Sequence, residues 1–191
     1  MKLSDRFNER NQLNYTQKKI EDPEILAGRM AEKFLADLVD SNLRYKGANC
    51  FLNKRVPSRE DGRRYEVDLM VLTKKQLNII EVKNWSGHLF ISDGKWKQQK
   101  RNGYVIEHTN VLKYFVKKKS VIVKYLKEKG IDLPPDFISH KVILINNNLA
   151  VSRDIQKNPD VITRDGLNDF LRSRKGAAFS EECSIQSLRP Q

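Results

Sequence analysis

The amino-acid sequence predicts an α/β fold in which a mixed central sheet is flanked by helices. Two segments, 65–72 and 76–83, are rich in aliphatic and β-branched residues, as central strands are. Two longer segments, 23–47 and 110–129, carry apolar residues at helical spacing. A further β run at 140–145 gives the order helix, antiparallel strands, helix, strand.

We expect a single domain over residues 23–175, between two flexible ends. A chain of 191 residues suits one domain of ordinary size better than two. Residues 1–22 are polar and without periodicity, which predicts a flexible N-terminal arm. Residues 176–191 are expected to form a flexible C-terminal tail.

The first helix is expected to begin at Pro23, which suits a first turn, with Asp22 as its N-cap. It should end near Gly47. Apolar residues that recur at helical spacing are expected to form its buried side. They are Ala27, Met30, Ala31, Phe34, Leu35 and Leu38.

A strand is expected at 50–56, joined to the next one by a turn that contains Asp61-Gly62. The two central segments that follow are apolar on both faces near their middles, so we expect both to be covered on two sides. Three further short strands are separated by Asp-Gly and Asn-Gly pairs, which are typical of hairpins. These strands are 88–91, 95–99 and 104–107.

The second helix is expected to bury one apolar side and to expose its lysines on the other. The buried side would consist of Leu112, Phe115, Val116, Ile122, Val123 and Leu126. Gly130 should end this helix, and Pro134-Pro135 prevents its continuation. After the strand at 140–145, we expect a short strand at 161–162 and a short helix at 167–171.

The two central segments contain charged residues. Asp68 lies in one, and Glu81 and Lys83 lie in the other. Buried charges are costly unless they are paired or bind a metal. A hairpin centred on Lys74-Lys75 would place Asp68 opposite Glu81, with Cβ atoms about 5 Å apart on one face. A one-residue slip would separate them, and Lys-Lys is a poor two-residue turn.

Two facing carboxylates predict a metal site. Asp68, Glu81 and the backbone carbonyl of Val82 would offer the oxygen ligands that Mg²⁺ or Mn²⁺ prefers. A lysine beside such a site, here Lys83, can orient water or stabilise a phosphoryl transition state. The alternative is a buried Asp/Glu–Lys ion pair without a catalytic role.

The arrangement resembles the NERD (nuclease-related) domain of the PD-(D/E)xK nuclease superfamily. The resemblance lies in Gly28-x-x-Ala31-Glu32, in Val67-Asp68, and in Ile80-Glu81-Val82-Lys83-Asn84-Trp85-x-Gly87. It implies a restriction-endonuclease-like core with the order α-β-β-β-α-β. It also implies that Asp68 and Glu81 are metal ligands and that Lys83 is the catalytic lysine. Glu32 would be an accessory carboxylate, unless it is an ordinary exposed helix residue.

The sequence departs from the family pattern at the second helix. The family often has N-P-x-x-Q there, whereas this chain has Asn110-Val111-Leu112-Lys113-Tyr114 and lacks the proline and the glutamine. That glutamine tends to face the active site in these folds, and Gln98 or Gln99 could take its place from another strand. This departure favours an alternative, a catalytically weak or inactive nucleic-acid-binding module with the same fold.

The charge of the chain points to nucleic acid. Lys and Arg number 36 against 24 acids, a net charge of +12, and eleven bases lie between Lys95 and Lys129 with only Glu107 and Glu128 as acids. A concentrated basic face is expected of a protein that binds a phosphate backbone, although a solvated lysine-rich surface is the alternative. The expected nucleic-acid-binding residues are Lys95, Lys97, Lys100, Arg101, Lys113, Lys117, Lys118 and Lys124. Trp85 and Trp96 could stack on bases or pack in the core.

Other functional classes find little support. No apolar stretch has the length of a membrane helix, no signal region is evident, and Cys50 and Cys183 form neither a metal-ligand pair nor a disulfide framework. We therefore expect an intracellular protein, cytoplasmic or nuclear. We expect a metal-dependent nuclease that hydrolyses phosphodiester bonds in DNA, more than in RNA, for repair or nucleic-acid processing. A homodimer or a partner protein could supply specificity, because the chain is short.

Overall fold

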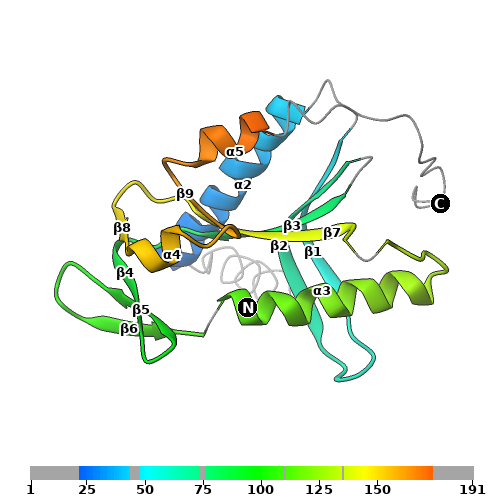
Figure 1. Ribbon diagram of the computed structural model, residues 1–191, viewed down its shortest axis with the longest axis horizontal. Helices are drawn as coiled ribbons and strands as arrows, with labels where there is room; N and C mark the ends of the chain where they lie inside the picture. Colours follow the sequence, from blue (N-terminus) through cyan, green and yellow to red (C-terminus); the bar gives the residue numbers. More distant parts are fainter. Residues whose placement is uncertain (1–21, 44–47, 74–75, 110, 135, 174–191) are drawn as a thin grey trace, which may run out of the picture.

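The computed structural model describes residues 22–43, 48–73, 76–109, 111–134 and 136–173. The expected C-terminal tail and all of the expected N-terminal arm except Asp22 lie outside these residues. The described helices and strands confirm an α/β fold with mixed sheets between helices (Figure 1). No helix in this part of the chain is long and apolar enough to cross a membrane.

The strands form two sheets. The larger has the order β1-β2-β3-β7-β9, in which β1, β2 and β3 are antiparallel and β3, β7 and β9 are parallel. Its strands are β1 (Asn49–Pro57), β2 (Arg64–Leu72), β3 (Leu77–Lys83), β7 (Ile138–Leu144) and β9 (Val161–Thr163). The smaller sheet has the order β6-β5-β4-β8. Its strands are β4 (Gly87–Ser92), β5 (Lys95–Gln99), β6 (Val105–His108) and β8 (Leu149–Val151).

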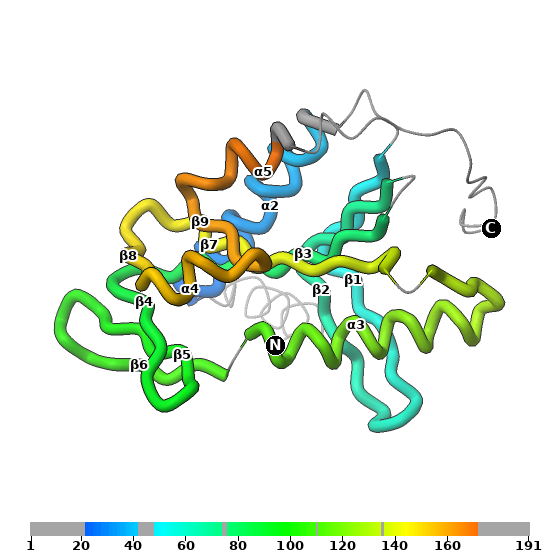
Figure 2. Tube along the Cα trace, viewed as in Figure 1, coloured from blue at the N-terminus to red at the C-terminus, as the bar shows by residue number. Residues whose placement is uncertain are grey.

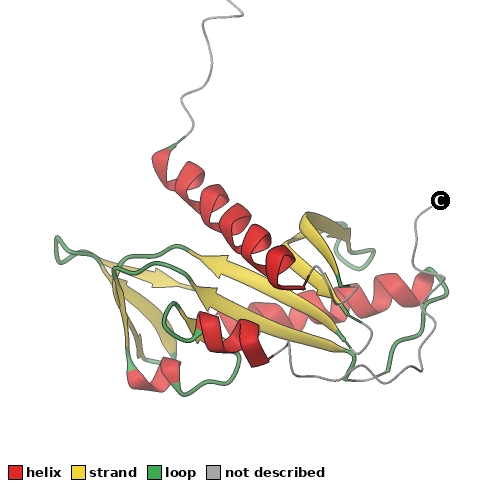
Figure 3. Cartoon of the chain, turned by 90° about the horizontal axis from the view of Figure 1, so that it is seen from above, coloured by secondary structure: helices red, strands yellow, loops and turns green. Residues whose placement is uncertain are grey.

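Helices cover both faces of the larger sheet. They are α2 (Pro23–Leu43), α3 (Val111–Glu128), α4 (Arg153–Gln156) and α5 (Leu167–Ser173). One hydrophobic cluster joins α2 and α5 to the sheet, and the other joins α3 and α4 to its opposite face and to the smaller sheet. Figure 1 shows α2 and α5 above the strands and α3 below, and in the view from above α3 lies behind the strands (Figure 3). We call these the α2 side and the α3 side.

The first helix begins where the sequence predicts, because the Asp22 carboxylate accepts a hydrogen bond from the N–H of Glu24 at 2.8 Å. Its buried side differs from the prediction. Leu35 and Val39 are buried, whereas Met30 and Phe34 are 65% and 48% exposed. The helix is therefore rotated so that a narrower stripe meets the sheet, and its described part ends at Leu43.

Most of the remaining elements lie where they were expected, but β8 and α4 were not predicted. Each is short, three and four residues, so neither shows a measurable periodicity in the sequence. The hairpin turn at Asp93-Gly94 is confirmed, since both residues have positive φ angles of 54° and 70°. The strands β4 to β6 join β8 in the smaller sheet instead of extending the larger one.

In the β1–β2 hairpin, the face of the sheet on which alternate side chains pack changes at Asn53 and Asp68. Residues two apart in a strand normally share a face, yet Val67 packs on the α3 side and Leu69 packs on the α2 side. At this point Asn53 has a φ of 50°, and the otherwise continuous register from Asn49–Leu72 to Pro57–Arg64 omits the Asn53–Asp68 pair. A local interruption of this kind redirects side chains, as a bulge does.

Candidate functional site

The hairpin register that the sequence predicts is present. The β2–β3 ladder runs from Leu72–Leu77 to Leu69–Ile80, and the N–H of Thr73 donates to the carbonyl of Gln76 at 2.9 Å. Beyond the last pair of this ladder, the N–H of Val82 donates to a side chain instead of to the main chain of β2. Its acceptor is Asp68 Oδ2, at 2.8 Å. Asp68 thus lies beside the end of β3, where Glu81 and Lys83 are.

Glu81 is held between two lysines. Its Oε1 accepts a hydrogen bond from Lys83 Nζ at 2.8 Å, and its Oε2 accepts one from Lys118 Nζ at 2.5 Å. Glu81 is 8% exposed and Lys118 only 3%. Buried charges of this kind require partners, and here β3 and α3 supply them to each other across the α3 side of the sheet.

The electrostatics of the two carboxylates differ. Burial and the charge of Glu81 raise the pKa of Asp68 to about 6, against the hydrogen bond from Val82 and the two lysines. Burial also acts to raise the pKa of Glu81, but Lys83 and Lys118 outweigh it and hold that pKa below its usual value. Glu81 is therefore the ionised member of the pair, and Asp68 is the member that takes up a proton first.

Glu32 reaches the edge of this cluster from α2. Burial raises its pKa, a hydrogen bond with the Asn53 side chain lowers it, and the charges of Glu66, Lys83 and Glu81 also act on it. Glu32 is thus within electrostatic range of the site and close to the interruption in β1. Gly28, one turn earlier in α2, has no atom within 4 Å of the place where a Cβ would lie, so it does not serve close helix–sheet packing.

A cavity of about 340 Å³ opens beside Glu81 and Lys83. Three aromatic side chains line it: Trp85 from the segment after β3, His108 from β6 and Tyr114 from α3. The Trp85 and His108 rings stack with centroids 3.9 Å apart, and Trp96, which is 1% exposed, packs edge-on against Trp85 at 6.5 Å. Trp96 is therefore a core residue, whereas Trp85 forms a wall of the cavity.

His108 in this wall is neutral near pH 7. Burial lowers its pKa, and the charges of Lys83 and Lys100 lower it further. Its Nε2 lies 2.9 Å from Gln98 Oε1, and Gln98 Nε2 donates to the carbonyl of Ser86 at 2.6 Å. The amide of Gln98 thus holds the Trp85 loop and does not take the place of the glutamine missing from α3.

Asn84 joins three elements at the end of β3. Its Nδ2 donates to the carbonyl of Ala27 in α2 at 3.1 Å, and its Oδ1 accepts from Asn146 Nδ2, beyond β7, at 2.9 Å. We expect Asn84→Ala to lower the free energy of unfolding by about 1–2 kcal/mol, because two hydrogen bonds are lost in a partly buried place. Urea denaturation measures this, and an unchanged midpoint would show that water replaces both bonds.

Gly87, three residues further on, lies where no side chain fits. Its φ is 95°, and a Cβ there would be 2.2 Å from the carbonyl oxygen of Gln99. The N–H of Gly87 donates to the carbonyl of Asn148 at 2.9 Å, at the start of the β4–β8 pairing. The glycine therefore lets the chain cross from the larger sheet into the smaller one directly after the site.

At least six of the eight cations expected to bind nucleic acid form ion pairs within the part of the chain that the structure describes. The pairs are Lys95–Glu107, Lys97–Asp93, Lys100–Glu24, Lys117–Asp61, Lys124–Glu60 and Lys118–Glu81. The first five are at least partly exposed, and such surface pairs contribute little and open readily. Arg101 is exposed, and Lys113 lies on an exposed part of α3.

Lys118 differs from the expectation that placed it on the exposed side of α3. The buried residues of this helix are Val111, Phe115, Lys118, Val121 and Ile122. Val116 and Val123, which were expected to be buried, are 65% and 38% exposed. The helix is rotated relative to the prediction because its true buried stripe passes through a lysine that Glu81 neutralises.

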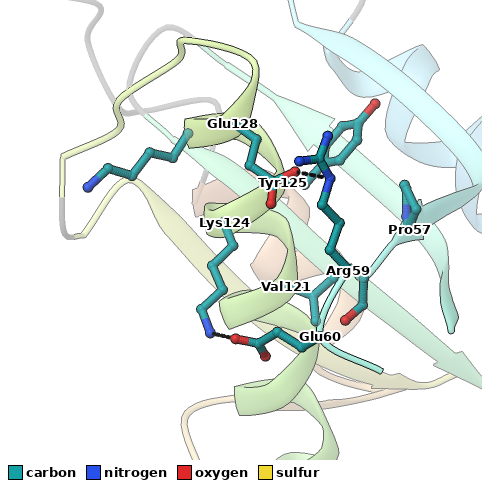
Figure 4. A pocket seen from close by; sticks show the side chains of 9 residues that line it. Pro57, Arg59, Glu60, Val121, Lys124, Tyr125 and Glu128 are labelled. Carbon is teal, nitrogen blue, oxygen red and sulfur yellow. Dashed lines mark hydrogen bonds and ion pairs between the residues drawn. The ribbon is translucent and has the colours of Figure 1, made fainter. Parts of the chain in front are cut away.

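The turn between β1 and β2 extends past α3 (Figure 2). Residues of this turn and of α3 line a groove. Figure 4 shows Arg59 directed to Glu128 and Glu60 directed to Lys124 across this groove. Its volume is about 290 Å³, and Tyr125 and Val121 line its helical side. The groove is separate from the cavity at Lys83 and shares no lining residue with it.

Oxygen donors for a metal are present, but not as a preformed cluster. No group of three or more His, Cys, Asp or Glu side chains with metal-binding geometry occurs within the described ranges. Asp68 and Glu81 are the two candidate side-chain ligands. The N–H of Val82 points to Asp68, and because N–H and C=O of one strand residue face the same neighbour, its carbonyl faces that way too.

Three contributions to the site were missed by sequence reasoning. Lys118 was detectable, because it lies four residues before Ile122 and three after Phe115 on an otherwise apolar stripe. Asn53 carries no signal beyond the tolerance of asparagine for positive φ. Tyr114 stands where the family has its glutamine, and it lines the cavity.

A comparison with protein families agrees with this geometry. Residues 27–145 match the nuclease-related domain, which is more than half of the chain and includes Glu32, Asp68, Glu81, Lys83 and Lys118. No curated protein matches the chain. The mixed sheet between helices is a restriction-endonuclease-like fold. The chain therefore belongs to the NERD (nuclease-related domain) family.

Proposed function

We propose that this protein is a metal-dependent nuclease that hydrolyses phosphodiester bonds in DNA. The observation that carries the proposal is the cluster of Asp68, Glu81 and Lys83 beside an aromatic cavity of about 340 Å³. Burying two carboxylates and a lysine together carries a cost, and clusters of this kind with a raised pKa are found preferentially at sites of chemistry or binding. Membership of a nuclease-related family supports the same function.

The residues fit Mg²⁺ or Mn²⁺. Burial and the charge of Glu81 raise the pKa of Asp68, and a dication between the two carboxylates would relieve their repulsion. Carboxylate and carbonyl oxygens, here of Asp68, Glu81 and Val82, are the ligands that both ions prefer. When bound, the ion would act as a Lewis acid, activating water and neutralising charge on a phosphate oxygen.

The side chains of the chain itself would divide the other tasks. Lys83 lines the cavity while holding Glu81, so its ammonium is placed to stabilise negative charge on a phosphoryl oxygen or to orient the attacking water. Trp85 and Tyr114 would form the walls against the sugar or base. Asp68 would serve as a ligand only when ionised, which favours activity above its pKa of about 6.

The lysines of α3 and of the β5–β6 hairpin would bind the phosphate backbone. Lys95, Lys97, Lys100 and Lys117 form ion pairs with acids at the surface, so phosphates would replace carboxylates that contribute little. Binding should therefore weaken steeply with salt. A second candidate function, binding without cleavage, is favoured by the two lysines that already neutralise Glu81.

Cleavage of plasmid and single-stranded DNA, with RNA of the same sequence in parallel, tests the proposal. We expect products with MnCl₂ or MgCl₂ and none in EDTA. Asp68→Asn protein purified in the same way controls for contaminating nucleases. Salt-dependent binding without cleavage would favour the binding module, and the absence of both would rule out both functions.

Glu32 is expected to assist cleavage without being essential for it. We expect Glu32→Gln to lower the initial rate of cleavage by about 10- to 100-fold, the usual effect of losing a group that supports metal ligands. Its position at the edge of the cluster, near Asn53, is the reason. Rates at saturating MnCl₂ measure this, and a rate equal to that of the wild type would make Glu32 an ordinary helix residue.

A further inference from the structure

The structure contains a second lysine at the candidate site, and its environment differs from that of Lys83. Lys118 Nζ lies 2.5 Å from Glu81 Oε2, and the residue is 3% exposed. Its ammonium also lies over two rings, 5.2 Å from the centroid of Tyr114 and 5.5 Å from that of Phe115. A buried ammonium on a short bond, with aromatic faces around it, is fixed in position.

Both oxygens of Glu81 therefore have cationic partners, one from β3 and one from α3. Asp68 lacks such a partner among the described residues, where Val82 N–H is its hydrogen-bond donor. The two carboxylates and two ammonium groups balance in formal charge before any metal is added. A divalent cation would bring two further positive charges into a pocket that is already neutral.

From this geometry we propose that Lys118 is a built-in counter-ion that competes with the metal for Glu81. With no metal present, it neutralises Glu81 and holds its side chain beside Asp68. A divalent cation held by Asp68 and Glu81 would draw Oε2 away from Lys118. Lys118 is thus a positioning residue that weakens metal affinity and stabilises the metal-free protein.

This inference rests on the proposed metal-dependent function, because it concerns the same carboxylates. It goes beyond that function by assigning opposite effects to one side chain. A lysine with only a packing role would, when replaced, weaken folding and metal binding together. A competing counter-ion would, when replaced, weaken the metal-free fold but tighten metal binding.

The test compares wild-type protein with Lys118→Met, which keeps an unbranched side chain against Phe115 and Tyr114. Titration calorimetry with MnCl₂ is expected to give a dissociation constant at least about tenfold lower for the variant, the size of a coupling between close charges. Urea midpoints in EDTA are expected to be lower for the variant. Added MnCl₂ should raise the midpoint of the variant more than that of the wild type.

Lys129→Met is the matched control. Lys129 follows α3, is exposed and lies 5.8 Å from the Tyr125 ring, so its loss changes the net charge equally without touching the site. We expect its affinity for Mn²⁺ to stay within about twofold of the wild-type value, since exposed charges are screened. If both variants tighten binding equally, net charge is the cause and the proposal for Lys118 is overturned.

A labelling experiment on wild-type protein covers the case in which Lys118→Met does not fold. Acetic anhydride should modify Lys118 slowly in EDTA and faster with MnCl₂, as mass spectrometry of tryptic peptides would show, because the ion displaces the ammonium from Glu81. Equal protection in both conditions would overturn the proposal.

The outcomes also separate the inference from the proposed function. Metal-dependent cleavage by the wild type, with unchanged Mn²⁺ affinity in Lys118→Met, would leave the nuclease proposal standing and overturn the role of Lys118. If the wild type neither binds Mn²⁺ nor cleaves, but Lys118→Met binds Mn²⁺, the nuclease proposal would be overturned and the role of Lys118 would stand. The lysine would then be what keeps the metal out.

Discussion

Replacement of Asp68 by asparagine is expected to abolish cleavage while making the metal-free protein more stable. The loss of rate should be about a thousandfold or more, since a metal ligand contributes several kcal/mol to the stabilisation of a phosphoryl transition state. Asparagine keeps the shape of the side chain and an oxygen that can accept the N–H of Val82. The assay is cleavage of plasmid DNA in MnCl₂.

The gain in stability follows from the pKa of Asp68. Burial and Glu81 raise this pKa from 3.8 to about 6, so the folded protein holds its proton more tightly than the unfolded chain does. Between pH 4 and 6 the unfolded chain loses that proton first, and the contribution of Asp68 to stability therefore falls as pH rises. Above pH 6 the full penalty, of order 3 kcal/mol, is present, and Asp68→Asn should remove it.

Urea denaturation in EDTA at pH 4.5 and pH 7.5 measures this effect. The urea midpoint of the variant should be clearly higher than that of the wild type at pH 7.5 and only slightly higher at pH 4.5. Addition of MnCl₂ should stabilise the wild type alone, because the ion binds the ionised pair. A difference between the two proteins that does not change with pH would contradict the assignment of the raised pKa to Asp68.

Gly87→Ala is expected to destabilise the protein by about 3–5 kcal/mol or to prevent folding. A Cβ at this position would lie 2.2 Å from the Gln99 carbonyl oxygen, which belongs to the backbone and cannot rotate away. The φ of 95° adds strain for any side chain. Relief would require β4 to move away from β5, with loss of ladder hydrogen bonds. The urea midpoint measures the loss.

Gly28→Ala is the matched control for this prediction. Gly28 lies inside α2, and a Cβ there would meet no atom within 4 Å. Alanine should therefore raise stability by up to about 1 kcal/mol, the difference in helix propensity between the two residues. Equal losses in both variants would show that the contact with Gln99 is not what fixes Gly87.

The hairpin was predictable because its constraints are local. A hairpin centred on Lys74-Lys75 places the apolar residues of the two strands opposite each other. The observed pairs Leu69–Ile80 and Leu72–Leu77 have this register. The Asp68 side chain then lies beside β3 as expected. The strand order of the larger sheet follows in part from these same contacts.

The position of α3 was less predictable, because its orientation depends on a long-range partner. Valines were assigned to the buried side and lysines to the solvent, yet Val116 is 65% exposed and Lys118 is buried. The carboxylate of Glu81, 37 residues away, makes the burial of Lys118 favourable. Patterns within a helix cannot reveal a partner on another element.

The surface charges were foreseen in number but not in arrangement. The acids that pair with the lysines of residues 95–124 come largely from other parts of the chain, as Glu24, Glu60 and Asp61 show. The count of bases in one segment therefore overstated the strength of a single basic face. Net charge is set by composition, whereas a local field depends on which elements meet.

The side change at Asn53 and Asp68 has a consequence for how the molecule unfolds. Because one hairpin packs on the α2 side near Leu69 and on the α3 side near Val67, the two hydrophobic clusters share a single structural unit. Melting of either cluster would pull the same strands away from the other. The two layers should therefore lose structure in one cooperative transition, and Asp68 lies at the junction that couples them.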